Sequence, residues 1–242
     1  MTTPVTTAAP KPVSVWEDFV DIFVSPAQVF ARREKAGFFV PLVVLTLVMV
    51  ALYFGTKSLM QPVMDAEFAR QTAAALKANP KLTAAQMESF RKVGETFAAV
   101  FVMVLTPIRV LLVGLVLWVV GKFFESKQTL GAAMVVATYA FFPLIVQQIA
   151  AGLIAAVTNP VSITGAASVT LSLARFLDPD HTSKMLFALA MRVDVFLIWI
   201  TVLLAIGLSV TGKISRTKAG IAAVIIWLLG AIPALFQAMR MG

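Results

Sequence analysis

The sequence predicts an all-α, polytopic membrane protein: a bundle of five transmembrane helices, with amphipathic interfacial helices before it and a helical hairpin between spans one and two. Three observations favour this class. Hydrophobic residues make up 60% of the 242 residues, and the mean hydropathy is +0.91. Charged residues make up only 13%, whereas soluble domains carry about 25%. The charges are also clustered, and the gaps between clusters are long enough to cross a bilayer.

The first 36 residues are expected to form a tail and two surface helices. Residues 1–13 are rich in Thr, Pro and Ala, lack the apolar run of a signal peptide and predict a disordered tail. Ser14-x-x-Glu17 and Ser25-Pro26-x-Gln28 have the form of capping boxes, which predicts a helix pair within residues 14–36. The side chains expected on its apolar faces are Trp16, Phe19, Phe23, Val29 and Phe30, opposite Glu17, Asp18, Asp21, Arg32 and Arg33. This pair is expected to lie on the cytoplasmic membrane surface, where it either anchors the first span or docks a partner protein.

The transmembrane domain is expected to occupy residues 37–242. A bilayer core about 30 Å thick needs about 20 helical residues, and five stretches between charge clusters reach that length. They predict spans near residues 38–57, 97–121, 131–157, 185–211 and 219–239. An odd number of spans places the two termini on opposite sides of the membrane.

Two outside loops are expected, at residues 58–96 and 158–184. In the first, Pro62 is expected to begin a helix that stops at Asn79-Pro80, and the capping box Thr83-x-x-Gln86 to begin a second helix. This hairpin would cover the bundle, either as a passive lid or as a ligand gate. The second loop has enough apolar residues around Val169–Leu177 for one short interfacial helix.

Local charge density decides the predicted orientation, because nine Lys and Arg residues fall on each side. Basic residues crowd the start of the first span and the turn between spans four and five: Arg32, Arg33, Lys35, Lys213, Arg216 and Lys218. The basic residues on the other side are diluted in a long loop that contains acids. This pattern favours a cytoplasmic N-terminus.

Composition and motifs argue against an enzyme. The chain has no cysteine and one histidine, His181, so neither a cofactor nor a metal is expected, although Asp178 and Asp180 lie beside that histidine. No metalloprotease, phosphate-loop or nucleophile-elbow motif is present. The net charge of +8 is assigned to residues flanking the membrane spans, so no nucleic-acid partner is expected.

Charged and amide side chains within the predicted spans are the candidate site: Arg109, Gln147, Gln148, Arg192 and Asp194. Intramembrane charges are costly and commonly functional. Arg109 and Asp194 are within reach of an ion pair across spans two and four, which would make the layer a polar lock between helices. The other interpretation is a ligand pocket, because two arginines against one acid leave a net positive site.

Prolines and small residues mark where helices bend or pack. Pro107, Pro143 and Pro233 are expected to kink or open their helices. Small-x-x-x-small pairs leave a homo-oligomer open: Ala133/Ala137, Ala151/Ala155 and Gly230/Ala234.

Three segments together resemble the Yip1 family, in its bacterial branch. They are the leader IFVSPAQVFARR, which contains Ser25 and Pro26, the run Tyr139-Ala-Phe-Phe-Pro143, and the fourth span with its tail, DVFLIWITVLLAIGLSVTGKISRTKAG. The resemblance extends from about Phe19 to Ile232. It implies a multi-pass protein of the bacterial inner (plasma) membrane with a cytoplasmic N-terminus and no catalytic site. The Asp-Leu-Tyr-Gly-Pro region of eukaryotic members is absent, which argues against their binding of Rab GTPases.

The leading functional hypothesis is a non-enzymatic membrane protein that binds a protein partner or organises membrane lipids. It would use the surface helices and the groove around Arg109 and Asp194. The alternative is a transporter or channel subunit that passes a small anionic solute or lipid through a polar pocket around Arg109, Asp194 and Gln147.

Overall fold

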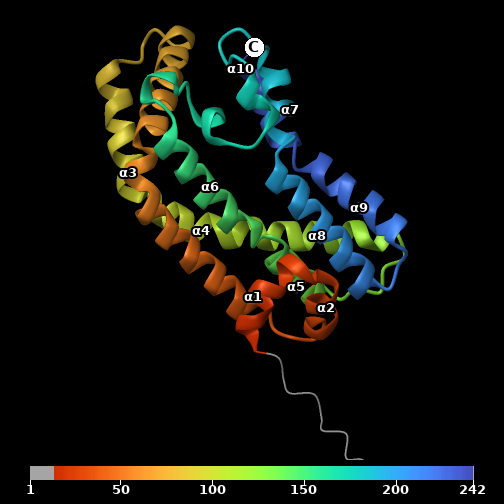
Figure 1. Cartoon of the computed structure of the whole chain (residues 1–242). Coiled ribbons are helices and arrows are strands. Elements are labelled where there is room, and N and C mark those ends of the chain that lie inside the picture. Colours follow the sequence, from red (N-terminus) through yellow and green to blue (C-terminus); the bar gives the residue numbers. More distant parts are fainter. Residues whose placement is uncertain (1–13, 242) are drawn as a thin grey trace, which may run out of the picture.

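The predicted architecture is confirmed in a computed structural model that describes residues 14–241. This part of the chain is helical without a strand (Figure 1). Within it, five helical segments are long and apolar enough to cross a membrane: Phe39–Ala78, Ala84–Phe123, Leu130–Val157, Val195–Gly212 and Arg216–Met239. The predicted disordered tail, residues 1–13, lies outside the described residues.

The N-terminal helix pair consists of α1 (Val15–Val24) and α2 (Pro26–Arg33). The expected capping boxes are wrong in detail. The Ser14 hydroxyl accepts from the N–H of Trp16, and Ser25 makes no side-chain cap bond, although Pro26 does begin α2. The pair packs on the bundle through α5 (Leu130–Ala140) and α8 (Val195–Gly212), so its inner face is covered by protein.

The hairpin between spans one and two is built from the spans themselves. Each of α3 (Phe39–Ala78) and α4 (Ala84–Phe123) is a continuous helix of 40 residues, about 60 Å long if straight. The prediction that a separate helix begins at Pro62 was wrong, because Pro62 lies inside α3. The next residue, Val63, is buried against the loop after span three, and this packing offsets the one backbone hydrogen bond that proline lacks.

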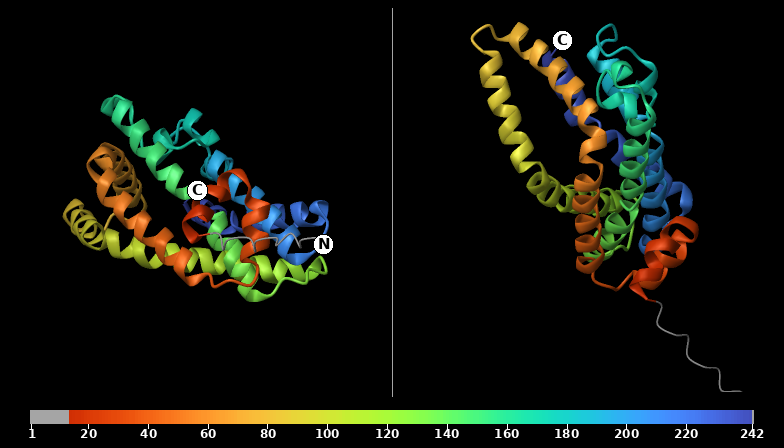
Figure 2. Two further views of the ribbon diagram at one scale, coloured as in Figure 1. Left: turned by 60° about the horizontal axis from the view of Figure 1, so that its bottom comes forward. Right: turned by 60° about the vertical axis from the view of Figure 1, so that its left-hand side comes forward.

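The turn at the tip of this hairpin matches its prediction. The Thr83 hydroxyl accepts from the N–H of Gln86 at 3.2 Å, and the Gln86 side chain accepts from the N–H of Thr83 at 2.9 Å. Further along, α4 changes direction, as Figure 2 shows, and Pro107 lies inside it as expected of a kink.

Spans three and five are interrupted, and span four is shorter than predicted. Span three divides into α5 and α6 (Pro143–Val157), and span five into α9 (Arg216–Leu229) and α10 (Ile232–Met241). The predicted span 185–211 is broken between α7 (Lys184–Arg192) and α8, because Asp194 caps the start of α8. The loop before α7 holds three short 3-10 helices, η1 (Pro160–Ser162), η2 (Ala166–Val169) and η3 (Leu173–Phe176), instead of one interfacial helix.

Small residues let α4, α5 and α8 approach closely. A Cβ atom at Gly207 of α8 would overlap Val136 of α5, and one at Gly114 of α4 would meet Met134. Ala133 and Ala137 are fully buried in this same contact. The first of the small-residue pairs considered for oligomerisation is therefore used for packing within the chain.

Candidate functional site

Arg109 lies at the middle of an uncharged run on α4. The nearest ionisable residues along the helix are Glu95, 14 positions before, and Lys122, 13 positions after. At about 1.5 Å per residue, Arg109 is therefore about 20 Å along the helix from either charge. Its side chain is exposed on the outside of the bundle, where membrane lipid would surround it.

A cavity of about 260 Å³ opens beside Arg109. We call it the Arg109 cavity; its lining comes from α3, α4 and the α5–α6 region: Met49, Phe101, Val102, Leu105, Thr106, Arg109, Phe141 and Leu144. The guanidinium carbon stands 5.4 Å from the centre of the Phe141 ring, a cation–π contact. Thr106, one turn earlier on α4, adds a hydroxyl to an otherwise apolar wall.

The predicted ion pair between Arg109 and Asp194 is not present in the structure. Within residues 14–241, Arg109 has neither an acidic partner nor a hydrogen-bond acceptor. Asp194 is engaged elsewhere, because it ends the break before α8 and is only 2% exposed. The polar lock therefore does not join spans two and four.

Asp194 caps α8 and contacts span three. Its Oδ1 accepts from the N–H groups of Phe196 and Leu197 at 2.9 and 3.2 Å, and from the Gln147 side chain at 3.3 Å. Its Oδ2 is buried without a hydrogen-bond partner in the described chain. Asp194 and Gln147 are thus neighbours as predicted, in a contact that links α6 to α8.

The remaining two predicted polar residues also bind neighbouring helices. Gln148 donates to the Thr56 hydroxyl at 3.1 Å and so links α6 to α3. Arg192 donates to the backbone carbonyl of Trp227 at 2.6 Å and lies over the ring of that residue. Of the five predicted site residues, Arg109 lines the Arg109 cavity and lacks a polar partner within the described chain, whereas the other four bind neighbouring helices.

A second charged cluster, which we call the Asp18 network, holds the N-terminal helices on the bundle. Asp18 is fully buried, and both of its oxygens are bound. Oδ1 accepts from Arg32 at 2.6 Å, and Oδ2 accepts from Arg33 and, at 3.1 Å, from the Tyr139 hydroxyl. Burial alone would lower the pKa of Arg32, but hydrogen bonds to Asp21 and Asp18 raise it.

Asp18 is the residue that sequence reasoning misplaced. It was expected on the polar face, yet it lies one turn before the buried Ile22, and Phe19 and Phe23 beside it pack on the bundle. Phe19 stacks on Phe142 with ring centres 4.9 Å apart, and Phe23 meets Trp199 at 5.4 Å. The spacing Asp18–Ile22 was the available signal, because residues four apart share a helix face.

The loop histidine forms an exposed pair and no metal cluster. His181 and Asp178 lie 2.6 Å apart through Nδ1 and Oδ2, and this hydrogen bond raises the pKa of His181 and lowers that of Asp178. Within the described residues, no group of three His, Cys, Asp or Glu side chains is placed to hold a metal ion.

Comparison with families of known proteins gives a match over most of the chain. The model of the Yip1 domain matches residues 20–236, which is most of the chain. The chain belongs to the Yip1 family. No curated protein and no solved structure matches it.

The Yip1 match covers each of the motif residues that carried the resemblance. Ser25 separates α1 from α2, and Pro26 begins α2. Tyr139 is buried near the end of α5 and donates to Asp18, while Pro143 begins α6 after the break in span three. Two distant parts of the family pattern therefore meet at the Asp18 network.

Proposed function

We propose that this Yip1-family protein is a non-enzymatic membrane protein that organises lipids by drawing an anionic headgroup to Arg109. In this proposal it lies in a bacterial inner membrane with its N-terminus in the cytoplasm, as the basic residues near the first span favour. The observation that carries the proposal is an arginine without a polar partner in the described chain, at the middle of an uncharged run, beside a cavity.

The free-energy cost of an unpaired charge inside a membrane supports a bound anion at Arg109. An arginine near the centre of a membrane helix costs about 3 kcal/mol by insertion measurements, and snorkelling, local thinning of the bilayer or an entering anion lowers that cost. Arg192 and Asp194 each have at least one polar partner in the described chain, from carbonyl, amide and backbone groups, although one atom of each side chain stays unbound. A headgroup phosphate would supply the partner that Arg109 lacks.

The shape of the site suits a lipid better than a small hydrophilic solute. Six of the eight residues that line the Arg109 cavity have apolar side chains, and polar groups come only from Thr106 and Arg109. Such a wall accepts hydrocarbon, while the guanidinium recognises phosphate by charge-assisted hydrogen bonds.

The outer face of α1 extends the lipid-contacting surface in this proposal. Trp16, Val20 and Val24 lie one turn apart and are exposed, Trp16 by 69%. Tryptophan favours the boundary between water and membrane.

Replacing Trp16 with Ser tests this contact by tryptophan fluorescence. If Trp16 enters the membrane boundary, its emission shifts to shorter wavelength when the protein is reconstituted in lipid. Trp16→Ser should remove that shift and leave the emission of the other tryptophans almost unchanged. An identical shift in both proteins would contradict this contact.

Crosslinking with a photoreactive lipid tests the headgroup site. The full chain is reconstituted with phosphatidylglycerol carrying a photoreactive group next to its phosphate, and crosslinked peptides are mapped by mass spectrometry. Arg109→Gln should reduce crosslinking to residues 101–109 about tenfold, because a hydrogen bond to a charged group contributes about 1.5–3 kcal/mol.

Arg91→Gln is the matched control. Arg91 lies on the same helix, but it is paired with Asp65 and Glu95 outside the cavity, so its loss should leave this crosslink unchanged. Equal crosslinking in the parent and in Arg109→Gln would refute the proposal. Protein-dependent exchange of labelled lipid or anion across vesicles, abolished by Arg109→Gln, would instead establish the transporter alternative.

A further inference from the structure

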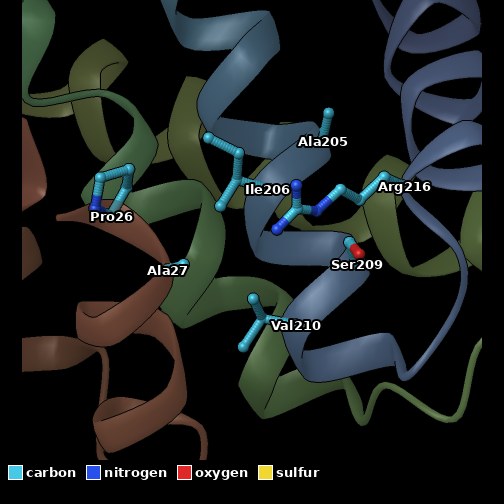
Figure 3. Close-up of a pocket in the computed structure, with 7 residues that line it drawn as sticks. All are labelled: Pro26, Ala27, Ala205, Ile206, Ser209, Val210 and Arg216. Atoms are coloured by element: carbon cyan, nitrogen blue, oxygen red, sulfur yellow. The ribbon is translucent and has the colours of Figure 1, made fainter.

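A second cavity, of about 330 Å³, lies at the N-terminal end of the bundle. We call it the α2–α8 groove; its lining is Pro26, Ala27, Ala205, Ile206, Ser209, Val210 and Arg216. Figure 3 shows Arg216 reaching from α9 across α8 toward Ile206, with Pro26 and Ala27 of α2 on the opposite side. None of these residues lines the Arg109 cavity.

Among the three basic residues at the turn between α8 and α9, Arg216 is the one without an ion-pair partner in the described chain. Lys213 donates to Glu34 at 3.0 Å, and Lys218 donates to Glu125 at 2.7 Å, so each neighbouring lysine already has an acid. Arg216 is exposed and forms no ion pair or hydrogen bond through its side chain to any described residue. It also stands at the first turn of α9, where the helix dipole favours an anion.

The wall of the groove is apolar apart from Arg216 and Ser209. The Ser209 hydroxyl donates to the carbonyl of Ile214 at 3.0 Å, so its hydrogen is used within the chain. The apolar wall of the groove runs along α8, which is one of the five segments long and apolar enough to cross a membrane. Arg216 lies near the end of the groove where α8 stops. An apolar groove with one cation at its end matches an amphiphile with one anionic group.

We propose that the α2–α8 groove binds an anionic phospholipid of the leaflet at this end of the bundle. Its phosphate would accept hydrogen bonds from Arg216, and one acyl chain would lie between α2 and α8. The volume is near the lower end for small-ligand sites, which suits one chain segment and a phosphate rather than a whole lipid. A bound lipid would then hold the N-terminal helix pair to span four.

Site-directed loss of a crosslink tests this inference. The full chain is reconstituted in phosphatidylcholine with phosphatidylglycerol whose acyl chain carries a photoreactive group. Arg216→Gln should reduce crosslinking to residues 205–210 about tenfold, as expected for one charge-assisted hydrogen bond. Lys213→Gln removes the same charge three positions away, outside the groove, and should leave the crosslink within about twofold of the parent.

Two further arms separate the alternatives. Ala205→Leu keeps Arg216 but fills the groove, so it too should remove the crosslink. Excess glycerol phosphate in the water phase should not compete, because a lipid is bound mainly through its chain. Full crosslinking in Arg216→Gln or in Ala205→Leu, or an equal signal from a phosphatidylcholine probe, would overturn the proposal. Arg109→Gln should not change this crosslink, which keeps the two sites experimentally distinct.

Discussion

The Asp18 network and the Arg109 cavity are two ways of placing charge in a largely apolar molecule. In the first, each carboxylate oxygen of Asp18 is bound by an arginine, and Tyr139 closes the cluster. In the second, the guanidinium of Arg109 has an aromatic ring beside it and no polar partner in the described chain. Removing one partner from a satisfied buried cluster leaves a charge buried without compensation and is costly, whereas a charge that has no polar partner in the fold has none to lose.

Replacing Asp18 with Ala should produce the largest loss of stability. The change leaves Arg33 and Tyr139 without their shared acid, and breaking a buried pair costs about 3 kcal/mol or more. We expect a clear fall in the apparent thermal midpoint in detergent, with early proteolysis within residues 14–36. Asp18→Asn keeps the shape of the side chain and some of its hydrogen bonds, so its thermal midpoint should lie between those of the parent and of Asp18→Ala. An Asp18→Ala protein as stable as the parent would show that the network is not structural.

Replacing Tyr139 with Phe should cost less, about 1.5 kcal/mol. The ring and its stacking on Phe142 remain, and only one hydrogen bond to a charged oxygen is lost. The same thermal scan measures this change. In an Asp18→Ala background the Tyr139→Phe change should have almost no further effect, because its partner is gone. Fully additive losses would argue that Tyr139 acts through packing instead.

Lowering the pH tests a third charged residue, Glu67, which is partly buried and bound by polar partners. Glu67 lies about 40 Å along α3 from its start, beyond the length that a bilayer core of about 30 Å takes. It accepts from Gln71, from the N–H of Ala166 and from Arg70. Burial alone would raise the pKa of Glu67, but these bonds lower it below the ordinary value of 4.5. Its contribution to stability is therefore full above pH 4.5 and is lost as the pH falls through the lowered value.

Amide hydrogen exchange of residues 163–170 is the measurement for this effect. Exchange should speed up, after correction for its intrinsic pH dependence, as the pH falls below about 4.5. Glu67→Gln should remove most of this pH dependence, whereas Glu88→Gln on the neighbouring helix, which has no such contact with the loop, should keep it. The same acid response in the Glu67→Gln protein would place the sensitive group elsewhere.

Arg109→Gln should have the smallest effect on stability, within about 0.5 kcal/mol, because no polar partner in the described chain is lost. Its midpoint in detergent should match that of the parent, while lipid crosslinking falls. This outcome would complete the contrast with Asp18. A loss as large as that of Asp18→Ala would mean that Arg109 is a structural residue.

Much of the fold followed from charge spacing. The gaps between charges located all five spans, and the capping box located the hairpin tip at Thr83. The breaks within the spans were harder to predict from the sequence. Pro143 and Pro233 were recognised, but Asp194 was taken as an intramembrane charge although its side chain caps a new helix. Aspartate occurs in both roles, and the sequence pattern around Asp194 did not show the break in the backbone that its side chain caps.

The candidate site was less predictable, because partners far apart in sequence decide it. Asp18 and Tyr139 are 121 positions apart, and no periodicity relates them. The sequence predicted that Arg109 and Asp194 lie within reach of each other across two spans, yet depth along a helix does not say which faces meet. The cavities depend on the shapes of three helices at once, and so does the unpaired state of Arg109.

The long helix α3 gives the molecule a mechanical property. It starts six residues after the end of α2 and runs 40 residues to the hairpin tip. A tilt of about 5° at the base of a rod about 60 Å long displaces its far end by about 5 Å. Because α3 packs along α4 and α6, such a tilt would be shared by the whole hairpin and by the second half of span three.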